Sequence, residues 1–309
     1  DKYNIETSVP FCEASNPGYV FDGFIDQDGN KITSPKGNYG DKVLTPQWKL
    51  DAENFIEFGS AYDLNIVDKT LLDELDKAIP SSDFVGEFTY NDTEYLRYKL
   101  STNGFFINDS YFPGNSFMYS KKVPITWLKL CDLDDNKSLY LSSKILSIFK
   151  SNYDCYAPYK DQPLRSYLNG EFISKFFSEE EASKLIETSV DNSEKIRETD
   201  YVCENTLEKV FPLSHKEMEQ YLPKLHSFEI AKSYDGERGL EYPVYIDSLG
   251  AVYSNLSMGT YSCGTTPLRN VSSSGCPYDH SMFYYSYDTG HYGSSRNLDI
   301  RPCIVLKNK

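Results

Sequence analysis

The stretch Pro163–Thr188, PLRSYLNGEFISKFFSEEEASKLIET, decides how the second half of the chain is interpreted. Its apolar residues recur at helical spacing, and Pro163 suits a first helical turn, where the backbone N–H has no partner in any case. Ser178, followed three residues later by Glu181, has the pattern of a capping box, which opens a second helix. The stretch therefore predicts two helices that meet at Ser178, with the rest of the second half packed around them.

On either side of this stretch, short apolar runs alternate with turn residues and predict a mixed α+β fold. The expected strands are Val20–Ile25, which leads into a hairpin at Asp28-Gly29, and then Lys31–Thr33, a short strand and turn over Ile56–Ser60, Glu94–Leu100, Ile125–Leu130 with Trp127, Leu139–Leu141, Val244–Ile246, Ala251–Tyr253, Pro267–Val271, Met282–Tyr287 and Ile300–Leu306. Further helices are expected after Asp68, over Lys144–Phe149, and from the capping box Ser214/Glu217 to Pro223. The Gly- and Pro-rich segment Phe105–Tyr119 is expected to be irregular.

The charge of the chain excludes two classes of partner. The 309 residues carry a formal net charge of −15, whereas nucleic-acid binding needs a basic face that displaces counterions. The same negative charge argues against an anionic membrane surface, and no apolar run is long enough to span a bilayer. We therefore expect no nucleic-acid partner and no membrane insertion by this chain. Because it opens at DKYNIET without a signal-peptide pattern, we expect it to be a fragment of a longer protein.

Residues 1–50 resemble the closing part of an internalin-type B repeat, a small β-grasp-like module of bacterial surface proteins. The matching residues are Gly18-Tyr19, Phe21-Asp22-Gly23-Phe24, Asp28-Gly29-Asn30-Lys31 and Leu44 with Gln47-Trp48. The family usually has Trp where this chain has Phe24, and its opening strand would lie upstream of residue 1. The resemblance implies a partial repeat and a place on a bacterial surface.

The segment from about residue 55 to the end resembles a bacterial domain of unknown function that is common in extracellular proteins. Six motifs occur in the same order: Ile125-Thr126-Trp127, Leu141–Leu146, Leu164–Asn169, Val190–Ser193, Lys209–Ser214 and Asp299–Pro302. The closing pattern, an Arg after a strand and a final Ile-Arg-Pro strand, is similar to the formylglycine-generating-enzyme branch of the C-type-lectin-like fold. Thr266–Arg269 departs from the common pattern of the unknown-function family, in which a Trp-Leu-Arg run is usual there. We therefore expect a lectin-like α+β domain over residues 51–309, with a helix pair, after the partial repeat 1–50.

The cysteine and histidine patterns give little support to catalysis or metal binding. Seven Cys without a C-x-x-C argue against a zinc ribbon, and Cys131 and Cys303 lie in apolar runs typical of buried thiols. The oxidase resemblance implies a cysteine pair, but the loop before the last strand holds only Cys276, because Cys263 precedes Pro267. Two remaining polar clusters fit loop and hairpin composition better than metal sites. They are His280 and His291 with Asp279 and Asp288, and the run Asp132 to Asn136. We expect no cofactor, no metal and no catalytic residues.

The strongest functional signal is the segment Cys276–Tyr292, CPYDHSMFYYSYDTGHY. Rigid aromatic rings alternate there with small polar groups, a mixture that is typical of surfaces that bind proteins or sugars. An alternative remains open, because alternate aromatics of a strand can face a core instead. The candidate ligand-binding residues are Arg269, Tyr278, His280, Tyr284, Tyr285, Tyr287 and Tyr292.

These patterns favour a non-enzymatic binding or adhesion module of a secreted or cell-wall-attached bacterial protein. Its partner would be a protein or glycan of a host or a neighbouring cell, bound through the Tyr-rich segment. This expectation depends more on the surface repeat that precedes the domain than on any single residue. Two alternatives from other classes stay open: an oxidase of the formylglycine-generating type and a structural spacer.

Overall fold

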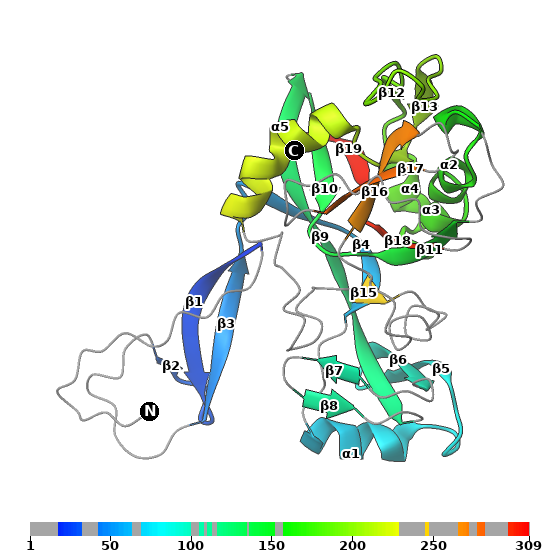
Figure 1. Ribbon diagram of the computed structural model, residues 1–309. Coiled ribbons are helices and arrows are strands. Elements are labelled where there is room, and N and C mark those ends of the chain that lie inside the picture. The colour runs from blue at the N-terminus through cyan, green and yellow to red at the C-terminus, as the bar shows by residue number, and fades with distance from the viewer. Residues whose placement is uncertain are drawn as a thin grey trace. The chain divides into compact units, whose positions relative to one another are not determined.

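The structure, a computed structural model, describes residues 18–32, 43–63, 69–99, 105–107, 110–112, 116–134, 136–151, 157–228, 245–246, 265–271, 277–281 and 296–308. The chain divides after Ile56 into two units, and each is considered by itself. Strands outnumber helices, and the expected mixed α+β class is confirmed (Figure 1).

In the described part of the first unit, three strands form an antiparallel sheet in the order β2-β1-β3: β1 Tyr19–Asp26, β2 Lys31–Ile32 and β3 Leu44–Leu50. The hairpin predicted at Asp28-Gly29 is confirmed, because Asp26 Oδ1 accepts hydrogen bonds from the backbone N–H groups of Asp28 and Asn30 at 3.0 and 2.8 Å. Such aspartate turns are a standard way to close a tight loop. The Phe21 ring contacts those of Phe24 and Trp48, with centroids 4.9 and 5.6 Å apart.

In the second unit, eight described strands form the main sheet (Figure 1). Its central path is β14-β19-β10-β9-β4-β15, and β6 pairs with both β5 and β9. These strands are β4 Phe55–Asp63, which begins at the boundary of the units, β5 Gly86–Tyr90, β6 Thr93–Lys99, β9 Phe117–Asp134, β10 Lys137–Ser142, β14 Val210–Phe211, β15 Tyr245–Ile246 and β19 Cys303–Lys307. The long strand β9 pairs with β6 over its first part and with β10 over its second part.

The strand predicted around Trp127 is confirmed and lies in the core of the sheet. Trp127 is fully buried, donates its indole N–H to the carbonyl oxygen of Phe58 at 2.7 Å, and stacks on Phe177. The hydrogen bond matters because a buried indole N–H without an acceptor would be costly. Trp127 thus joins the sheet to the helical stretch that contains Phe177.

The stretch Pro163–Thr188 forms three short helices where the sequence predicted two. They are α2 Pro163–Leu168, α3 Glu171–Phe176 and α4 Glu179–Lys184. The first predicted helix is divided because Asn169 turns its side chain to other backbone groups: its Oδ1 accepts from the N–H of Lys209 and of Val210. The predictions of Pro163 in the first turn and of the Ser178/Glu181 capping box are confirmed.

Two predictions between residues 105 and 151 are wrong. The segment 144–149 is not a helix; Ser147–Ser151 is β11, which pairs with β18 Arg296–Ile300. The helix cannot start because Arg301 binds the carbonyl oxygens of Ser142 and Ser143, and the N–H of Leu146 donates to Ile300. The segment 105–119, predicted to be irregular, contains β7 Phe105–Ile107, β8 Ser110–Phe112 and the start of β9.

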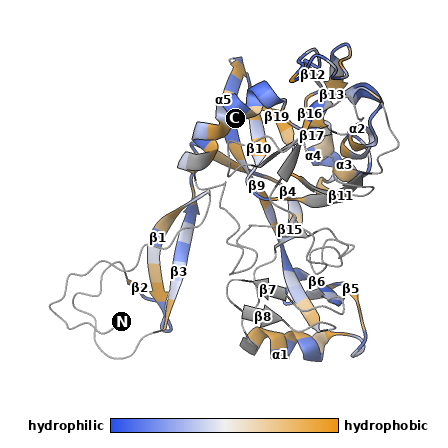
Figure 2. Cartoon of the chain, in the orientation of Figure 1, coloured by the Kyte–Doolittle hydropathy of each residue, from blue (hydrophilic) through white to orange (hydrophobic). Residues whose placement is uncertain are grey.

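The helix predicted after Asp68 is confirmed as α1 Lys69–Ala78, and Leu75 on its buried face packs with Tyr95 and Tyr119. Figure 2 shows hydrophobic and hydrophilic residues side by side on this helix, as expected of an amphipathic element. The helix predicted after Ser214 is α5 His215–Ser227, and its capping box with Glu217 is confirmed. It does not end at Pro223, as predicted, because Leu225 beyond it is fully buried and holds the last turn in place.

The end of the chain contains a strand break that the sequence did not indicate. Instead of one strand over Ile300–Leu306, β18 ends at Ile300 and β19 begins at Cys303, because Arg301 turns back to bind the β10 end. The remaining described strands form two-stranded ribbons: β12 Thr188–Val190 with β13 Thr206–Glu208, and β16 Thr265–Val271 with β17 Pro277–Ser281. The strands predicted over 251–253 and 282–287 lie outside the described residues.

Candidate functional site

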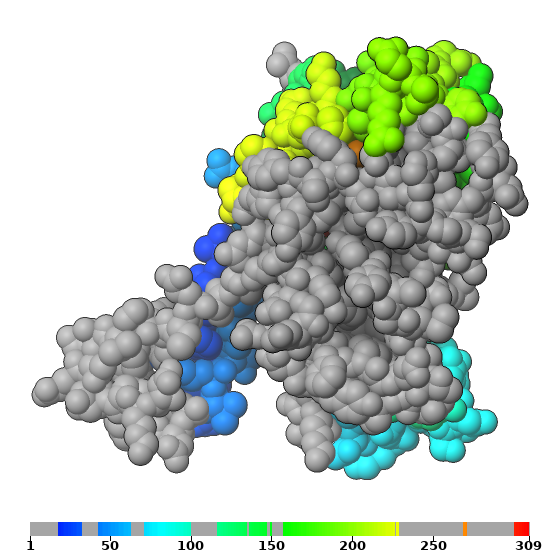
Figure 3. All heavy atoms as spheres, in the orientation of Figure 1, coloured from blue at the N-terminus to red at the C-terminus, as the bar shows by residue number. Residues whose placement is uncertain are grey.

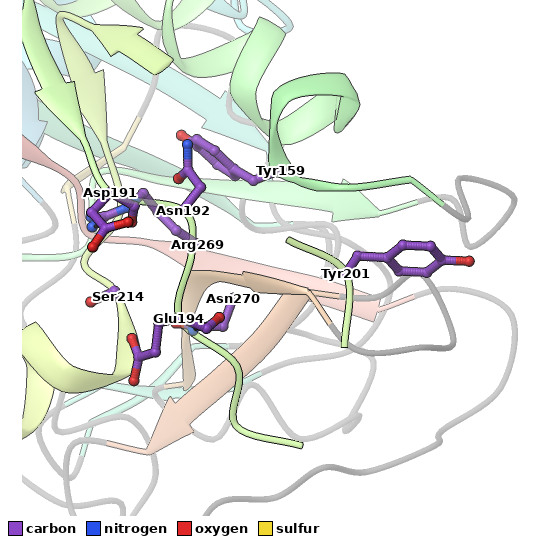
Figure 4. A pocket seen from close by; sticks show the side chains of 8 residues that line it. All are labelled: Tyr159, Asp191, Asn192, Glu194, Tyr201, Ser214, Arg269 and Asn270. Atoms are coloured by element: carbon purple, nitrogen blue, oxygen red, sulfur yellow. Dashed lines mark hydrogen bonds between the residues drawn. The ribbon is translucent and has the colours of Figure 1, made fainter. Parts of the chain in front are cut away.

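A polar pocket lies where β16 meets the segment after β12 and the start of α5. We call it the Arg269 pocket. Its space is about 230 Å³, part of which is open solvent, and it is lined by Tyr159, Asp191, Asn192, Glu194, Tyr201, Ser214, Arg269 and Asn270 (Figure 4). Tyr159 comes from the short 3₁₀ helix Tyr159–Asp161, which precedes α2. The pocket thus joins four stretches that are distant from one another in the sequence.

The Arg269 side chain lines the pocket, and its positive charge is paired with a carboxylate of the same chain. Its side chain is 1% exposed, and its two terminal nitrogens donate to the two carboxylate oxygens of Glu217 at 2.7 and 2.9 Å. The backbone oxygens of Pro212 and Asp191 accept from the same two nitrogens at 2.7 and 3.4 Å. A bidentate arginine–carboxylate ion pair of this kind fixes the planar guanidinium group in one orientation.

Three buried polar atoms of the lining have no hydrogen-bond partner among the described residues: Nε of Arg269, Oδ1 of Asn192 and the hydroxyl of Tyr159. The three residues are 3%, 8% and 2% exposed. Buried polar atoms are nearly always hydrogen-bonded in native proteins, so these three atoms are candidates for binding a polar group. Figure 4 shows Tyr159 pointing toward Asn192, and Tyr201 pointing away from the other side chains.

The orientation of the Asn192 amide follows from its other contacts. Its Nδ2 donates to the backbone oxygen of Glu204 at 3.2 Å and to Oγ1 of Thr206 at 3.0 Å. Since a carbonyl oxygen can only accept, the nitrogen must be on that side. Oδ1 is therefore the atom that remains for the pocket, and it offers only an acceptor.

Tyr159 presents a neutral phenol to the pocket. Burial raises the pKa of its hydroxyl, and the charge of Glu208 raises it further, while Arg269 and Arg165 act in the opposite direction. A protonated phenol can both donate and accept a hydrogen bond. The pocket thus combines one donor at Arg269, one acceptor at Asn192 and one group of either kind at Tyr159.

The rim of the pocket is acidic. Hydrogen bonds from the side chain and the backbone N–H of Ser193 lower the pKa of Asp191, so this carboxylate is ionised at neutral pH. The Glu194 carboxylate lies 3.2 Å from Nδ1 of His215 and accepts from the backbone of Lys216. Asn270 braces this rim by accepting from the N–H of His215 at 2.7 Å and donating to the Glu194 carbonyl oxygen at 3.2 Å.

The candidate residues from the sequence fall in different places. Arg269 lies in the pocket. Tyr278 and His280 lie on β17, whose backbone pairs with β16 so that His280 is opposite Thr266; nothing further is described of their side chains. Tyr284, Tyr285, Tyr287 and Tyr292 lie outside the described residues, as do Cys276 and His291.

Sequence reasoning missed Tyr159 and Asn192 as site residues. Asn192 stands in one of the motifs that carried the family resemblance, and this was the only available signal. Nothing in the local sequence distinguishes Tyr159 from the other 25 tyrosines. Its significance depends on a tertiary contact with residues 32 or more positions away, which a local pattern does not contain.

The two cysteines predicted to be buried differ in their exposure. Cys303 is fully buried, as predicted, and burial raises its pKa far above the usual thiol value, so the reactive thiolate is suppressed. Cys131, expected to be buried, is only partly so; its sulfur lies 3.1 Å from the Tyr221 hydroxyl. Among the described residues no three His, Cys, Asp or Glu side chains gather as metal ligands. The predicted hairpin near Asp134 is confirmed by the β9–β10 pairing.

The pocket region reaches the molecular surface. Figure 3 shows atoms of α5 and of the β12–β13 region next to each other, with a small area in the colour of β16 visible between them. Of the helices in the described part of the chain, none has both the length and the apolarity that crossing a bilayer requires.

No curated protein and no solved structure matches the chain. A family match is found for residues 135–308, which lie inside the segment whose motifs resemble a bacterial domain of unknown function. These residues include every member of the Arg269 pocket. Because the match extends over more than half of the 309 residues, the chain belongs to the family described as a domain of unknown function (DUF6273).

Proposed function

We propose that the chain is a non-enzymatic binding module of an extracellular bacterial protein, which recognises a protein or glycan of a host or neighbouring cell. The observation that carries the proposal is the Arg269 pocket, whose lining residues include three with a buried, unpaired polar atom. Fixed hydrogen-bond partners on a rigid scaffold are what specific recognition requires.

The Tyr-rich segment is assigned the larger part of the contact. Arg269 lies on β16, and β17, which pairs with β16, contains Tyr278 and His280. Residues 282–292, with Tyr284, Tyr285, Tyr287 and Tyr292, follow β17 directly in the sequence. We propose that these tyrosines supply contact area while the pocket supplies directional hydrogen bonds, a division of roles that is common in protein and sugar binding.

The extracellular location and the finer fold assignments belong to the same proposal. Residues 1–50 resemble a B repeat of surface proteins, and the C-terminal domain resembles the C-type-lectin-like class. Both resemblances come from sequence motifs, and both favour a module that is displayed outside the cell. The net charge of −15 favours protein or neutral-glycan partners over nucleic acid.

Binding to a combined glycan and protein array tests the proposal. The whole chain should bind a limited set of ligands, and replacing Tyr284, Tyr285 and Tyr287 together by Ala should abolish that binding while the circular dichroism spectrum is unchanged. Tyr90→Ala is the matched control, because Tyr90 lies on β5 and bonds to Glu74, away from the pocket lining. The proposal fails if the triple variant binds like the wild type, or if it unfolds, because the three tyrosines would then be core residues.

A further inference from the structure

The donor and acceptor pattern of the Arg269 pocket defines the chemical group that fits it. We propose that the pocket accepts one hydroxyl group of a neutral, polyhydroxylated ligand, that is, a saccharide; this inference rests on the proposed binding function and narrows it to a ligand class. Three observations point to such a ligand: the three unpaired buried atoms, the charges around them and the size of the pocket.

Hydrogen-bond complementarity requires a group that both donates and accepts. Arg269 Nε can only donate and Asn192 Oδ1 can only accept, whereas the Tyr159 hydroxyl adapts to either role. An alcohol hydroxyl accepts from Nε, donates to Oδ1, and still has a lone pair for Tyr159. A carboxylate would leave Oδ1 without a donor, and an ammonium group would leave Nε without an acceptor. A phosphate that keeps an O–H can donate, but it brings a negative charge with it.

The charges around the pocket favour a neutral ligand. The Arg269 charge is paired with both oxygens of Glu217, and the carboxylates of Asp191 and Glu194 line the pocket. An anion would meet these two carboxylates with no free positive charge to offset them, and a cation would have to enter beside the guanidinium edge. A neutral hydroxyl avoids both penalties.

The size of the pocket fits one hydroxyl rather than a whole sugar ring. Its enclosed cavity volume is about 10 Å³, at the lower end of what a cavity needs to hold one water-sized group. The rest of the ligand must therefore lie outside, on the surface where Figure 3 shows α5 and the β12–β13 region meeting. A water molecule has the same bonding capacity, so an ordered water only is the competing outcome.

Nuclear magnetic resonance of the Arg269 Nε–H group tests this inference on the whole chain. The probes are glucose, galactose, mannose and N-acetylglucosamine, with glycerol as a small polyol and sodium phosphate as an anion. We expect at least one sugar to shift the Nε–H signal saturably and phosphate to leave it unchanged. Tyr159→Phe, which removes only the hydroxyl, should weaken the binding of that sugar about ten-fold, the usual effect of losing one such hydrogen bond.

Tyr62→Phe is the matched control, because it removes a buried phenol hydroxyl from β4, which contributes nothing to the pocket lining. It should leave sugar binding unchanged. The inference is overturned if no sugar shifts the signal, if phosphate shifts it in their place, or if Tyr159→Phe binds the sugar as the wild type does. An ordered water only, which no sugar displaces, also overturns it.

The outcome can be separated from that of the broader function. Array binding that disappears in the Tyr284/Tyr285/Tyr287 variant but persists in Tyr159→Phe overturns the hydroxyl subsite and leaves the binding module intact. A sugar-dependent shift at Arg269 without any array binding has the opposite meaning: the subsite exists, but the Tyr-rich segment does not use it.

Discussion

Three arginines show how single residues organise this fold: Arg165 and Arg301 lie in the resemblance motifs, and Arg269 lies outside them. Arg165 binds Glu208, which is fully buried; Arg269 binds Glu217; and Arg301 donates to the backbone oxygens of Ser142 and Ser143. Each joins stretches more than 40 residues apart, and each buried charge has a partner, as burial demands. These arginines therefore serve the architecture, and Arg269 also has one buried atom, Nε, without a hydrogen-bond partner among the described residues.

Gly59 gives the sharpest prediction for a single residue. Its φ is +74°, and an added Cβ would lie 2.6 Å from the Phe176 carbonyl oxygen and 2.8 Å from the Phe177 ring. Gly59→Ala should therefore lower the free energy of unfolding of the second unit by about 3 kcal/mol, from backbone strain plus overpacking. Urea denaturation measures this change.

Gly86→Ala is the control for this experiment. Gly86 also has a positive φ, +145°, but an added Cβ would lie 3.4 Å from the Phe84 ring, which is an ordinary contact. This variant adds backbone strain without a close approach to the backbone of another element. An equal loss of stability in the two variants would contradict the close packing of β4 against the α3–α4 region.

At the scale of elements, the sequence predicted the helix caps better than it predicted where a helix or strand is interrupted. The Ser178/Glu181 and Ser214/Glu217 boxes are local signals, because the partners stand three residues apart, and both are present. The division of α2 from α3 was not predictable, since it depends on Asn169 bonding to residues 40 positions away. The strand β11 was mistaken for a helix for the same reason: Arg301, at the other end of the domain, fixes the preceding turn.

Glu181 gives a prediction for the cap between α3 and α4. Burial alone would raise its pKa, but hydrogen bonds from the backbone and side chain of Ser178 and from the Gly59 N–H lower it overall. A carboxylate whose pKa is lower in the folded state stabilises the fold at pH values above its unfolded-state pKa. This contribution to stability is lost as the pH falls through its folded-state pKa. Glu181→Gln should therefore reduce the unfolding free energy by about 1–2 kcal/mol at pH 7 and by less near about pH 3.5.

The neighbouring Glu180 provides the control. It pairs with Lys184 at 2.7 Å across an exposed helix face, where ion pairs contribute little. Glu180→Gln should change the stability only slightly at either pH, as measured by urea denaturation. If the unfolding free energies of the two variants depended on pH in the same way, the hydrogen bond from the Gly59 N–H to the Glu181 carboxylate would have no role in the cap.

At the scale of the whole molecule, the candidate site is a product of tertiary structure. Its lining comes from a 3₁₀ helix before α2, a segment after β12, a capping serine and a late strand. The order of apolar runs and turn residues predicted a mixed α+β protein, composition gave the negative net charge, and Arg269 was chosen from the sequence. Tyr159 and Asn192, which line the pocket together with Arg269, lie 110 and 77 positions earlier in the sequence. No local pattern reaches that far.

The central claim is that the chain binds its ligand through the Arg269 pocket and the tyrosines that follow β17. The most direct measurement is a crystal structure of the whole chain with a glycan selected on the array. We predict one ligand hydroxyl within about 3.2 Å of Arg269 Nε, Asn192 Oδ1 and the Tyr159 hydroxyl, with rings of residues 284–292 against the rest of the ligand. A ligand bound elsewhere on the molecule, with only a water molecule between these three atoms, would contradict the claim.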